Sequence, residues 1–383
     1  MNSIYVDYNA TTPPDPEIAE IANEITRQRW GNPSSAHATG REARFHIDDC
    51  RCRLADLWSC KPSELIFTGG GTESVNTALF GAARLKKDHG RRILTTPIEH
   101  HAVLHSLEYL RKNEGFEIDY LPVDRLGRVH LDAVKEAVTP ETILVSVMAA
   151  NNETGVLQPV AEIGAWLREA SVLFHTDAIQ WFGKQPLDSI REFNADLVSL
   201  CAHKFHGPRG AGLLFARSPL LPEPILFGGG HENERRAGTE NTGAIVGMTE
   251  AIARFTSKPV FDPETLGPWA QKLRETVEAL DSVVVWTPDD GDALSNTLAF
   301  TVDGADGMTL IASLDLEGVA VSSGSACSAG SIEPSHVIRS IGGSESQANA
   351  LVRISLGREN TLDQIDSLVS ILPRAISSAR GTL

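Results

Sequence analysis

Long hydrophobic runs and paired cysteines are both missing from this sequence. No stretch approaches the ~18 apolar residues that a membrane-spanning helix needs. Residues 1–7 lack the basic and apolar regions of a secretory signal. The five cysteines are an odd number without the spacing of a disulfide framework, which favours reduced thiols. We therefore expect a cytoplasmic protein that does not enter a membrane.

Positive charge is also scarce, with 34 Lys and Arg against 50 Asp and Glu and a net charge of −16 at pH 7. No large basic surface is available for a nucleic-acid backbone, so we expect no direct nucleic-acid partner. Histidines at zinc spacing are missing near Cys52 and Cys60, and HExxH is missing around His101 and His105. The sequence therefore predicts no metal site.

Short apolar runs alternate with amphipathic segments between residues 65 and 201 of this 383-residue chain. This alternation predicts a mostly parallel sheet covered by helices on both faces. Ligands bind such sheets at the carboxyl ends of the strands. Residues 256–263 are typical of a linker, and a helix from Trp269 to Leu280 is expected beyond it. The length and this break favour two domains, the second smaller and of α+β type.

Lys204 follows the apolar run Leu197–Cys201 and precedes a turn rich in glycine and proline. A lysine is seldom kept at the end of a core strand unless its amine has a task. An amine held out of bulk water has a lowered pKa and can attack carbonyl groups as a nucleophile. The alternative is a lysine whose amine simply extends from the strand end into solvent.

Residues 69–74, of sequence GGGTES, lie between a predicted strand and a predicted helix. Glycines let the backbone approach an anion, and the helix N-terminus offers unpaired N–H groups to which Thr72 adds a hydroxyl. Neither the P-loop pattern nor the dinucleotide pattern is present. A tight connection without a ligand is the alternative.

Asp177 ends an apolar strand in the sequence His175-Thr176-Asp177. A carboxylate at that depth needs a cationic or donor partner. A protonated pyridine nitrogen fits this requirement, because the pair keeps the ring an electron sink. A cap on the following turn is the alternative. His100, at another strand exit, could stack on an aromatic cofactor, and Asn152 adds an amide after a third strand.

Cys327 lies in a run of small residues, 322–331, that cannot bury enough apolar area to order itself firmly. A thiol in such a run is exposed, and this favours a role as nucleophile or sulfur acceptor. Arg353 lies inside a predicted strand. Its partner there is either a substrate carboxylate or a neighbouring acidic side chain.

With these residues in place, the chain closely resembles the cysteine desulfurases of the NifS/IscS type, a pyridoxal-phosphate family within the class V aminotransferases. The resemblance runs nearly end to end. Its motifs are Asp7–Thr12, Gly31–Ser35, Gly71–Glu73, Glu99-His100, Asn151–Glu153, His175–Ala178, Ala202–Lys204, Arg236–Thr239, Ser322–Cys327 and Arg353–Arg358.

The resemblance implies a role for each matching residue. Lys204 would hold the pyridoxal 5'-phosphate and take the substrate α-proton, Cys327 would accept the sulfur, and His100 would stack on the ring and move protons. The cofactor contacts would be Gly71, Thr72 and His203 at the phosphate, Asp177 at the pyridine nitrogen, Gln180 at the ring hydroxyl, and Thr239 at the phosphate of the other subunit. The substrate carboxylate would be held by Asn152 and Arg353.

The implied fold is that of fold-type I pyridoxal-phosphate transferases. Residues 14–256 would form a large domain with a mostly parallel seven-stranded sheet, and residues 1–13 and 257–383 a smaller α+β domain. The implied protein is a homodimer that converts L-cysteine to L-alanine. A persulfide on Cys327 would then pass its sulfur to an acceptor protein, such as an iron–sulfur scaffold, or into thiolation.

Two departures from the family pattern bear on these roles. Cys201 stands where the family commonly has a serine that binds phosphate, which implies either weaker cofactor binding or another role for this thiol. The chain stops at Leu383, before the tail by which some members dock a scaffold, and this leaves the acceptor open. Alternative functions are a selenocysteine lyase or other pyridoxal-phosphate lyase or transaminase on this scaffold, and a non-catalytic sulfur-relay protein.

Overall fold

A seven-stranded sheet forms the centre of the computed structural model, which describes residues 3–324 and 333–381. Its strand order is β2-β8-β7-β6-β5-β3-β4, and only β8 runs antiparallel to its neighbours. The strands are β2 (Leu65–Thr68), β3 (Arg92–Thr95), β4 (Glu117–Tyr120), β5 (Thr142–Ser146), β6 (Leu173–Asp177), β7 (Leu197–Cys201) and β8 (Gly212–Ala216). The predicted mostly parallel, seven-stranded α/β fold is confirmed.

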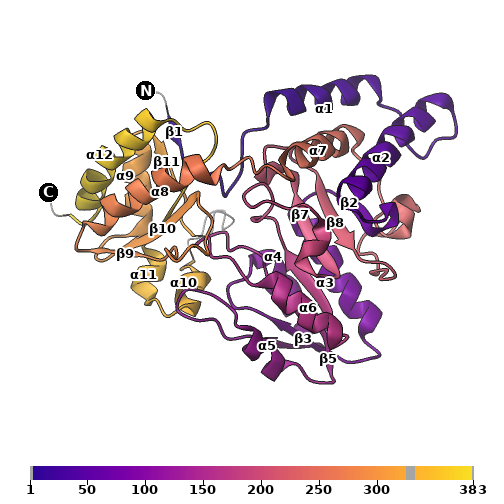
Figure 1. Ribbon diagram of the computed structural model, residues 1–383, viewed down its shortest axis with the longest axis horizontal. Coiled ribbons are helices and arrows are strands. Elements are labelled where there is room, and N and C mark those ends of the chain that lie inside the picture. Colours follow the sequence, from indigo (N-terminus) through magenta and orange to yellow (C-terminus); the bar gives the residue numbers. More distant parts are fainter. Residues whose placement is uncertain (1–2, 325–332, 382–383) are drawn as a thin grey trace.

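Helices cover this sheet because each of its parallel strands is joined to the next through a crossover (Figure 1). They are α1 (Pro16–Gln28), α2 (Ala38–Leu57), α3 (Gly71–Lys86), α4 (His101–Glu114), α5 (Leu131–Ala137), α6 (Val160–Glu169) and α7 (Thr242–Phe255). Short 3₁₀ turns are η1 (Pro62–Glu64), η2 (Ile190–Phe193), η3 (Ala202–Lys204) and η4 (His231–Glu234).

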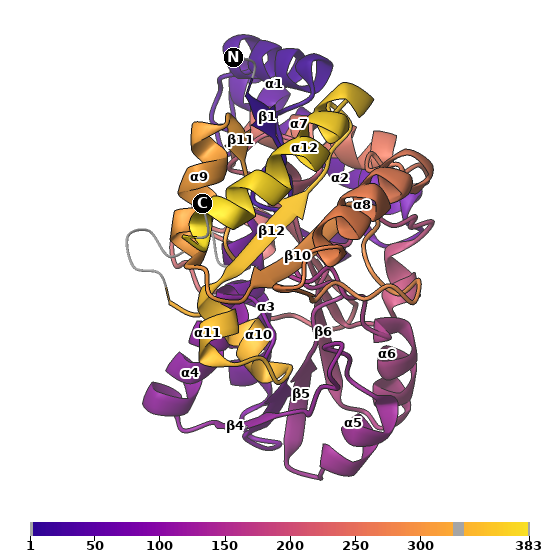
Figure 2. The same cartoon turned by 90° about the vertical axis from the view of Figure 1, so that its left-hand side faces the viewer.

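A second, smaller group of elements lies beside the large sheet (Figures 1 and 2). Its antiparallel sheet has the order β12-β10-β9, and β1 pairs in parallel with β11. The elements are β1 (Ile4–Tyr5), β9 (Val283–Val285), β10 (Thr297–Val302), β11 (Val319–Ala320), β12 (Leu351–Ser355), α8 (Pro263–Glu278), α9 (Gly307–Leu316), α10 (His336–Ser340), α11 (Glu345–Asn349) and α12 (Leu362–Ala379). The domain limits at 13/14 and 256/257 stay a prediction.

The helix expected from Trp269 is wrong in its start, because α8 begins at Pro263 inside the segment assigned to the linker. The Asp262 carboxylate accepts a hydrogen bond from the Glu264 N–H (3.2 Å) and caps the helix. Pro263 fits the first helical position, where no N–H donor is needed. Strand β8 was also missed, since periodicity alone does not distinguish a short apolar run in a strand from one in a buried helix.

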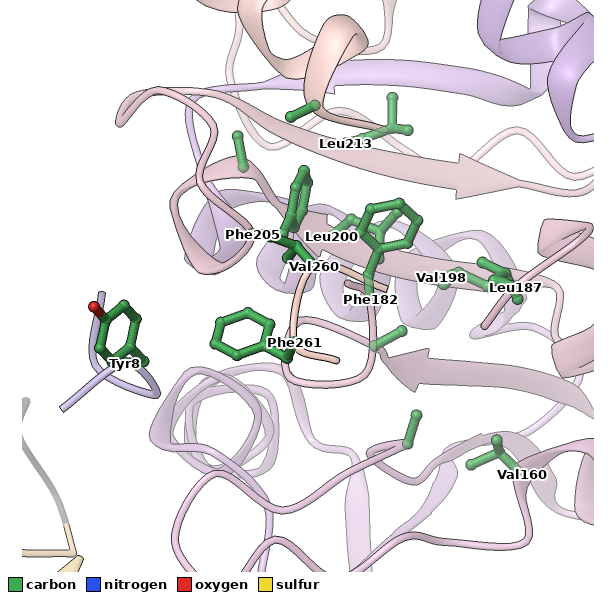
Figure 3. Close-up of a cluster of buried hydrophobic side chains, with 14 of the residues drawn as sticks. Tyr8, Val160, Phe182, Leu187, Val198, Leu200, Phe205, Leu213, Val260 and Phe261 are labelled. Atoms are coloured by element: carbon green, nitrogen blue, oxygen red, sulfur yellow. The ribbon is translucent and has the colours of Figure 1, made fainter. Parts of the chain in front are cut away.

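The apolar core lies directly behind the strand that precedes Lys204. Phe205, Phe182 and Phe261 belong to one buried cluster (Figure 3). The rings of Phe182 and Phe205 meet edge to face, with centroids 4.6 Å apart. This packing holds in place the segment that follows Lys204 in the sequence. In the part of the chain that the structure describes, no helix has both the length and the apolar character needed to cross a bilayer.

Candidate active site

A cavity of about 330 Å³ opens where parallel strands of the large sheet end. β6 ends at Asp177 and β7 leads into Lys204, while His100 follows β3 and Asn152 follows β5. Ligands of open α/β sheets bind at these carboxyl ends. The cavity wall brings together ten of the residues singled out in the sequence: Gly71, Thr72, His100, Asn152, Asp177, Gln180, Cys201, His203, Lys204 and Arg353.

The described part of the cavity wall does not include the other two predicted site residues. Thr239 is exposed in the loop between η4 and α7 and does not line the cavity of this single chain. Its predicted contact is with another subunit. Cys327 lies outside the described residues.

The Lys204 amine is oriented by the N-terminal segment. Its Nζ donates hydrogen bonds to the carbonyl oxygens of Asn9 (2.6 Å) and Ala10 (2.7 Å). The side chain leaves from η3, directly after β7, and reaches the cavity. A half-buried primary amine beside a cavity can act as nucleophile and as proton acceptor.

The Asp177 carboxyl group lies at the end of β6 and is only 4% exposed. Burial raises its pKa to about 6, against the opposing effects of the Ile179 N–H, which donates to Oδ1 (3.0 Å), and of the Lys204 charge. Such a group gains stability as a carboxylate when a cation is placed beside it. Asp177 therefore suits a cationic ring nitrogen better than a neutral ligand.

Helix α3 presents its N-terminus to the same cavity. Gly70 provides no side-chain cap, so the first N–H groups are available to an anion. A Cβ on Gly71 would lie 2.5 Å from Ile179 Cδ1 and 3.2 Å from Cys201 Cβ, so only glycine leaves this space open. Gly71 and Thr72 also border an adjoining open hollow, which Arg209 lines. This end of the cavity therefore fits a phosphate group.

Two histidines at the cavity are held neutral by their surroundings. Burial, followed by the charge of Lys204, lowers the pKa of His100 and that of His203 to about 4. His100 Nδ1 accepts the N–H of Ala102 (3.1 Å) and so begins α4. His203 Nδ1 lies 3.1 Å from Thr11 Oγ1. A neutral imidazole can stack on an aromatic ring and offers one nitrogen as donor and the other as acceptor.

Cys201 is buried at the end of the cavity that Gly71 and Thr72 line. Its thiol lies 3.8 Å from the Ala211 carbonyl oxygen, its acceptor. Burial raises the pKa of this thiol, which keeps it protonated and a weak donor.

Arg353, in β12, forms the opposite wall and is 2% exposed. Its Nη2 donates to Asp7 Oδ1 and its Nη1 to the Asn152 carbonyl oxygen, each at 2.8 Å. Asp7 is thus a neighbouring acidic side chain, one of the two kinds of partner expected for Arg353 from the sequence. Because the guanidinium also lines the cavity, the ion pair holds its planar group at the place where a carboxylate could bind.

Buried groups that the sequence did not single out surround the site. Glu153 is 1% exposed, accepts a hydrogen bond from the Ser335 hydroxyl, and has a pKa raised by burial. The His336 ring lies 4.7 Å from that of His101. The Asn-Asn-Glu motif was a signal for Glu153, but no local pattern links residues 101 and 336. No metal-binding group of three or more His, Cys, Asp or Glu occurs among the described residues.

Comparison with known proteins gives consistent matches over the whole chain. The profile of the aminotransferase class-V family matches residues 4–368. The putative cysteine desulfurase IscS 1 of Bacillus subtilis is 43% identical over 366 residues, covering 95% of this chain and 96% of that protein. The cysteine desulfurase IscS of Clostridium botulinum strain Hall is 40% identical, covering 98% and 95%. A solved NifS-like protein superposes with a TM-score of 0.90 at 35% identity, covering 98% of this chain and 100% of that one.

Proposed function

Because the chain belongs to the aminotransferase class-V family, whose cysteine desulfurases depend on pyridoxal phosphate, we propose that it is a pyridoxal-phosphate-dependent cysteine desulfurase. One observation carries the proposal: the Lys204 amine, the Asp177 carboxyl group and the Arg353 guanidinium line one cavity. These are the three groups needed to hold an aldehyde cofactor, keep its ring nitrogen protonated and bind an amino-acid carboxylate. The names of the relatives support the desulfurase activity.

The cavity fits this cofactor at both ends. The phosphate would lie at the α3 N-terminus, where Gly71 leaves space and Thr72 offers a hydroxyl. The pyridine nitrogen would lie against Asp177, whose raised pKa falls when a cation arrives. His203 would contact the phosphate, Gln180 the ring hydroxyl, and Thr239 the phosphate bound by another subunit of a homodimer.

When bound, the cofactor supplies an electron sink that permits cleavage at the carbons of the substrate amino acid. Lys204, released from the carbonyl oxygens of Asn9 and Ala10, would take the α-proton of L-cysteine. Arg353 and Asn152 would hold the substrate carboxylate and fix the orientation of that proton. The neutral His100 imidazole would stack on the ring and move a second proton.

Sulfur transfer would be the task of Cys327. Its thiolate would attack the substrate sulfur, and the Cβ–S bond would break with its electron pair left on the carbon fragment. Protonation of that fragment would give L-alanine and leave a persulfide on the protein. The persulfide would then pass to an acceptor protein, for which an iron–sulfur scaffold and a thiolation partner both have suitable chemistry. We also propose a cytoplasmic location for the protein.

The test is to incubate the purified protein, loaded with pyridoxal phosphate, with L-cysteine and a reductant, and to assay alanine and sulfide. We expect both products from the wild type and neither from Lys204→Ala. Cys327→Ser should form neither product beyond background. Equal product from all three proteins would end the proposal. If Cys327→Ser keeps full turnover while Lys204→Ala is inactive, the result would favour a lyase that does not use a persulfide.

A further inference from the structure

Lys184 is a buried amine directly behind the candidate active site. It is 2% exposed, although lysine is almost never fully buried without a partner. Its Nζ donates a hydrogen bond to Gln180 Oε1 and lies 5.1 Å from the centroid of the Phe261 ring. Phe261 belongs to the apolar cluster behind Lys204 (Figure 3). The ammonium therefore meets an amide on one side and an aromatic face on the other.

A chain of hydrogen bonds connects this amine to Lys204. Gln180 accepts from Lys184 through Oε1 and donates through Nε2 to the Asn9 carbonyl oxygen (2.8 Å). The same carbonyl oxygen accepts from Lys204 Nζ (2.6 Å). Gln180 lines the cavity and Lys184 does not, so Lys184 contacts a cavity residue from behind.

The contacts with Lys184 and with the Asn9 carbonyl oxygen both favour one orientation of the Gln180 amide. An amide has one end that only accepts and one end that only donates, and an ammonium only donates. If the amide were turned over, its oxygen would face the Asn9 carbonyl oxygen, and this contact would be repulsive. The hydrogen bond that Lys184 Nζ donates to Gln180 Oε1 would also be lost. The observed orientation keeps the donor end beside the cavity and the Asn9 carbonyl.

The charged groups around Lys184 make its position costly. Burial, and then the charges of Lys204 and Arg353, hold the pKa of the Lys184 amine well below its usual 10.5. The Lys184 amine thus lies within electrostatic reach of the Lys204 and Arg353 side chains. A hydrophobic residue of similar size would avoid this cost, which argues that the amine is present for its contact with Gln180.

We propose that Lys184 is a positioning residue for the cofactor, which holds the Gln180 amide with its donor end toward the cavity. This inference rests on the proposed function, because the ring hydroxyl is the acceptor that such a donor would serve. The alternative is that Lys184 only fills space between Gln180 and Phe261.

A double-mutant cycle separates these two roles. Lys184→Met, Gln180→Ala and the double variant are titrated with pyridoxal phosphate, and each cofactor-free protein is melted. We expect Lys184→Met to raise the cofactor dissociation constant about threefold to tenfold, the effect of one hydrogen bond. In the Gln180→Ala background the same substitution should change the constant by less than about twofold. Lys272→Met, at an exposed lysine paired with Asp366, is the control and should bind as the wild type does.

Two results would overturn the role of Lys184. One is an equal fold-change from Lys184→Met with and without Gln180. The other is an unchanged dissociation constant, whether or not the melting temperature of the cofactor-free protein falls. A wild type that binds no pyridoxal phosphate would instead reject the proposed function, on which this inference rests. Binding by the wild type together with an unchanged Lys184→Met would reject the inference alone.

Discussion

Arg353 Nη2 donates a hydrogen bond to Asp7 Oδ1 across 2.8 Å, joining strand β12 to the N-terminal segment at the cavity wall. The Arg353 side chain is 2% exposed, and the other terminal nitrogen is held by the Asn152 carbonyl oxygen. A guanidinium fixed at two points loses little freedom when a carboxylate binds. The pair therefore holds a planar, charged group at the cavity wall, where the carboxylate of the proposed substrate would bind.

Removal of this guanidinium should weaken substrate binding. We expect Arg353→Ala to raise the KM for L-cysteine roughly tenfold to a hundredfold, as for a lost charged hydrogen bond. Arg353→Lys should recover part of the loss, because it restores charge but not the fork of donors. Steady-state alanine production measures KM, with the exposed Arg374→Ala as control. A KM unchanged in Arg353→Ala would exclude Arg353 as the carboxylate contact.

Gly71 should tolerate no side chain. In Gly71→Ala the new Cβ would lie 2.5 Å from Ile179 Cδ1, so either the Ile179 side chain must move within the cavity wall or the start of α3 must shift. We expect at least about a tenfold rise in the dissociation constant of pyridoxal phosphate, measured by titration.

Gly267→Ala is the matched control for Gly71, because Gly267 also lies in a helix and its nearest neighbour is Ser295 Cβ at 3.9 Å. It should leave cofactor binding unchanged, because Gly267 lies in α8 and does not line the cavity. Equal cofactor affinity in both variants would contradict a phosphate site at Gly71.

Much of the candidate site could be predicted because its residues follow apolar strands. His100, Asn152, Asp177 and Lys204 each come after a run that indicates a buried strand, and parallel strands end at one edge of a sheet. Gly71 was predictable for a related reason, since a glycine turn before a helix marks an anion site. The sequence alone could therefore predict that these residues lie close together.

The remaining contacts depend on segments that are distant in the sequence. The Asn9 carbonyl oxygen accepts from Lys204, and Asp7 pairs with Arg353 across more than three hundred residues of chain. Backbone carbonyls and cross-domain ion pairs leave no periodic pattern. Lys184 was missed because a lone lysine after a glycine usually indicates an exposed turn.

Cys201→Ser should strengthen cofactor binding. The thiol lies near the α3 N-terminus and donates weakly, to Ala211 at 3.8 Å. A serine hydroxyl is a stronger donor to phosphate. We expect the dissociation constant of pyridoxal phosphate to fall about threefold to tenfold, measured by titration of the cofactor-free protein. Cys201→Ala, which removes the donor altogether, is the comparison. A serine variant no tighter than the alanine variant would show that residue 201 does not contact the phosphate.

The buried Glu99 should make stability depend on pH. It is 0% exposed, and its Oε1 accepts from Thr96 Oγ1 (2.8 Å) and the Met148 N–H (2.9 Å). Its Oε2 has no hydrogen-bond partner among the described residues. Burial raises its pKa from 4.5 to about 8. Between these values the folded protein holds a proton that the unfolded chain releases, so this contribution to stability falls as pH rises.

Glu99→Gln removes that titration and keeps the acceptor oxygen. The useful range lies above pH 6.5, because the depressed pKa of His175, about 3, affects stability only below the usual histidine value of 6.5. From there to pH 8, the variant should gain on the wild type by about 1–2 kcal/mol in free energy of unfolding. Urea unfolding of the cofactor-free proteins measures this difference. Glu108→Gln is the control, since exposed ion pairs lower the pKa of Glu108 to about 2 and confine its effect to acidic pH. Parallel curves for Glu99→Gln and wild type would mean that Glu99 is already ionised at pH 6.5.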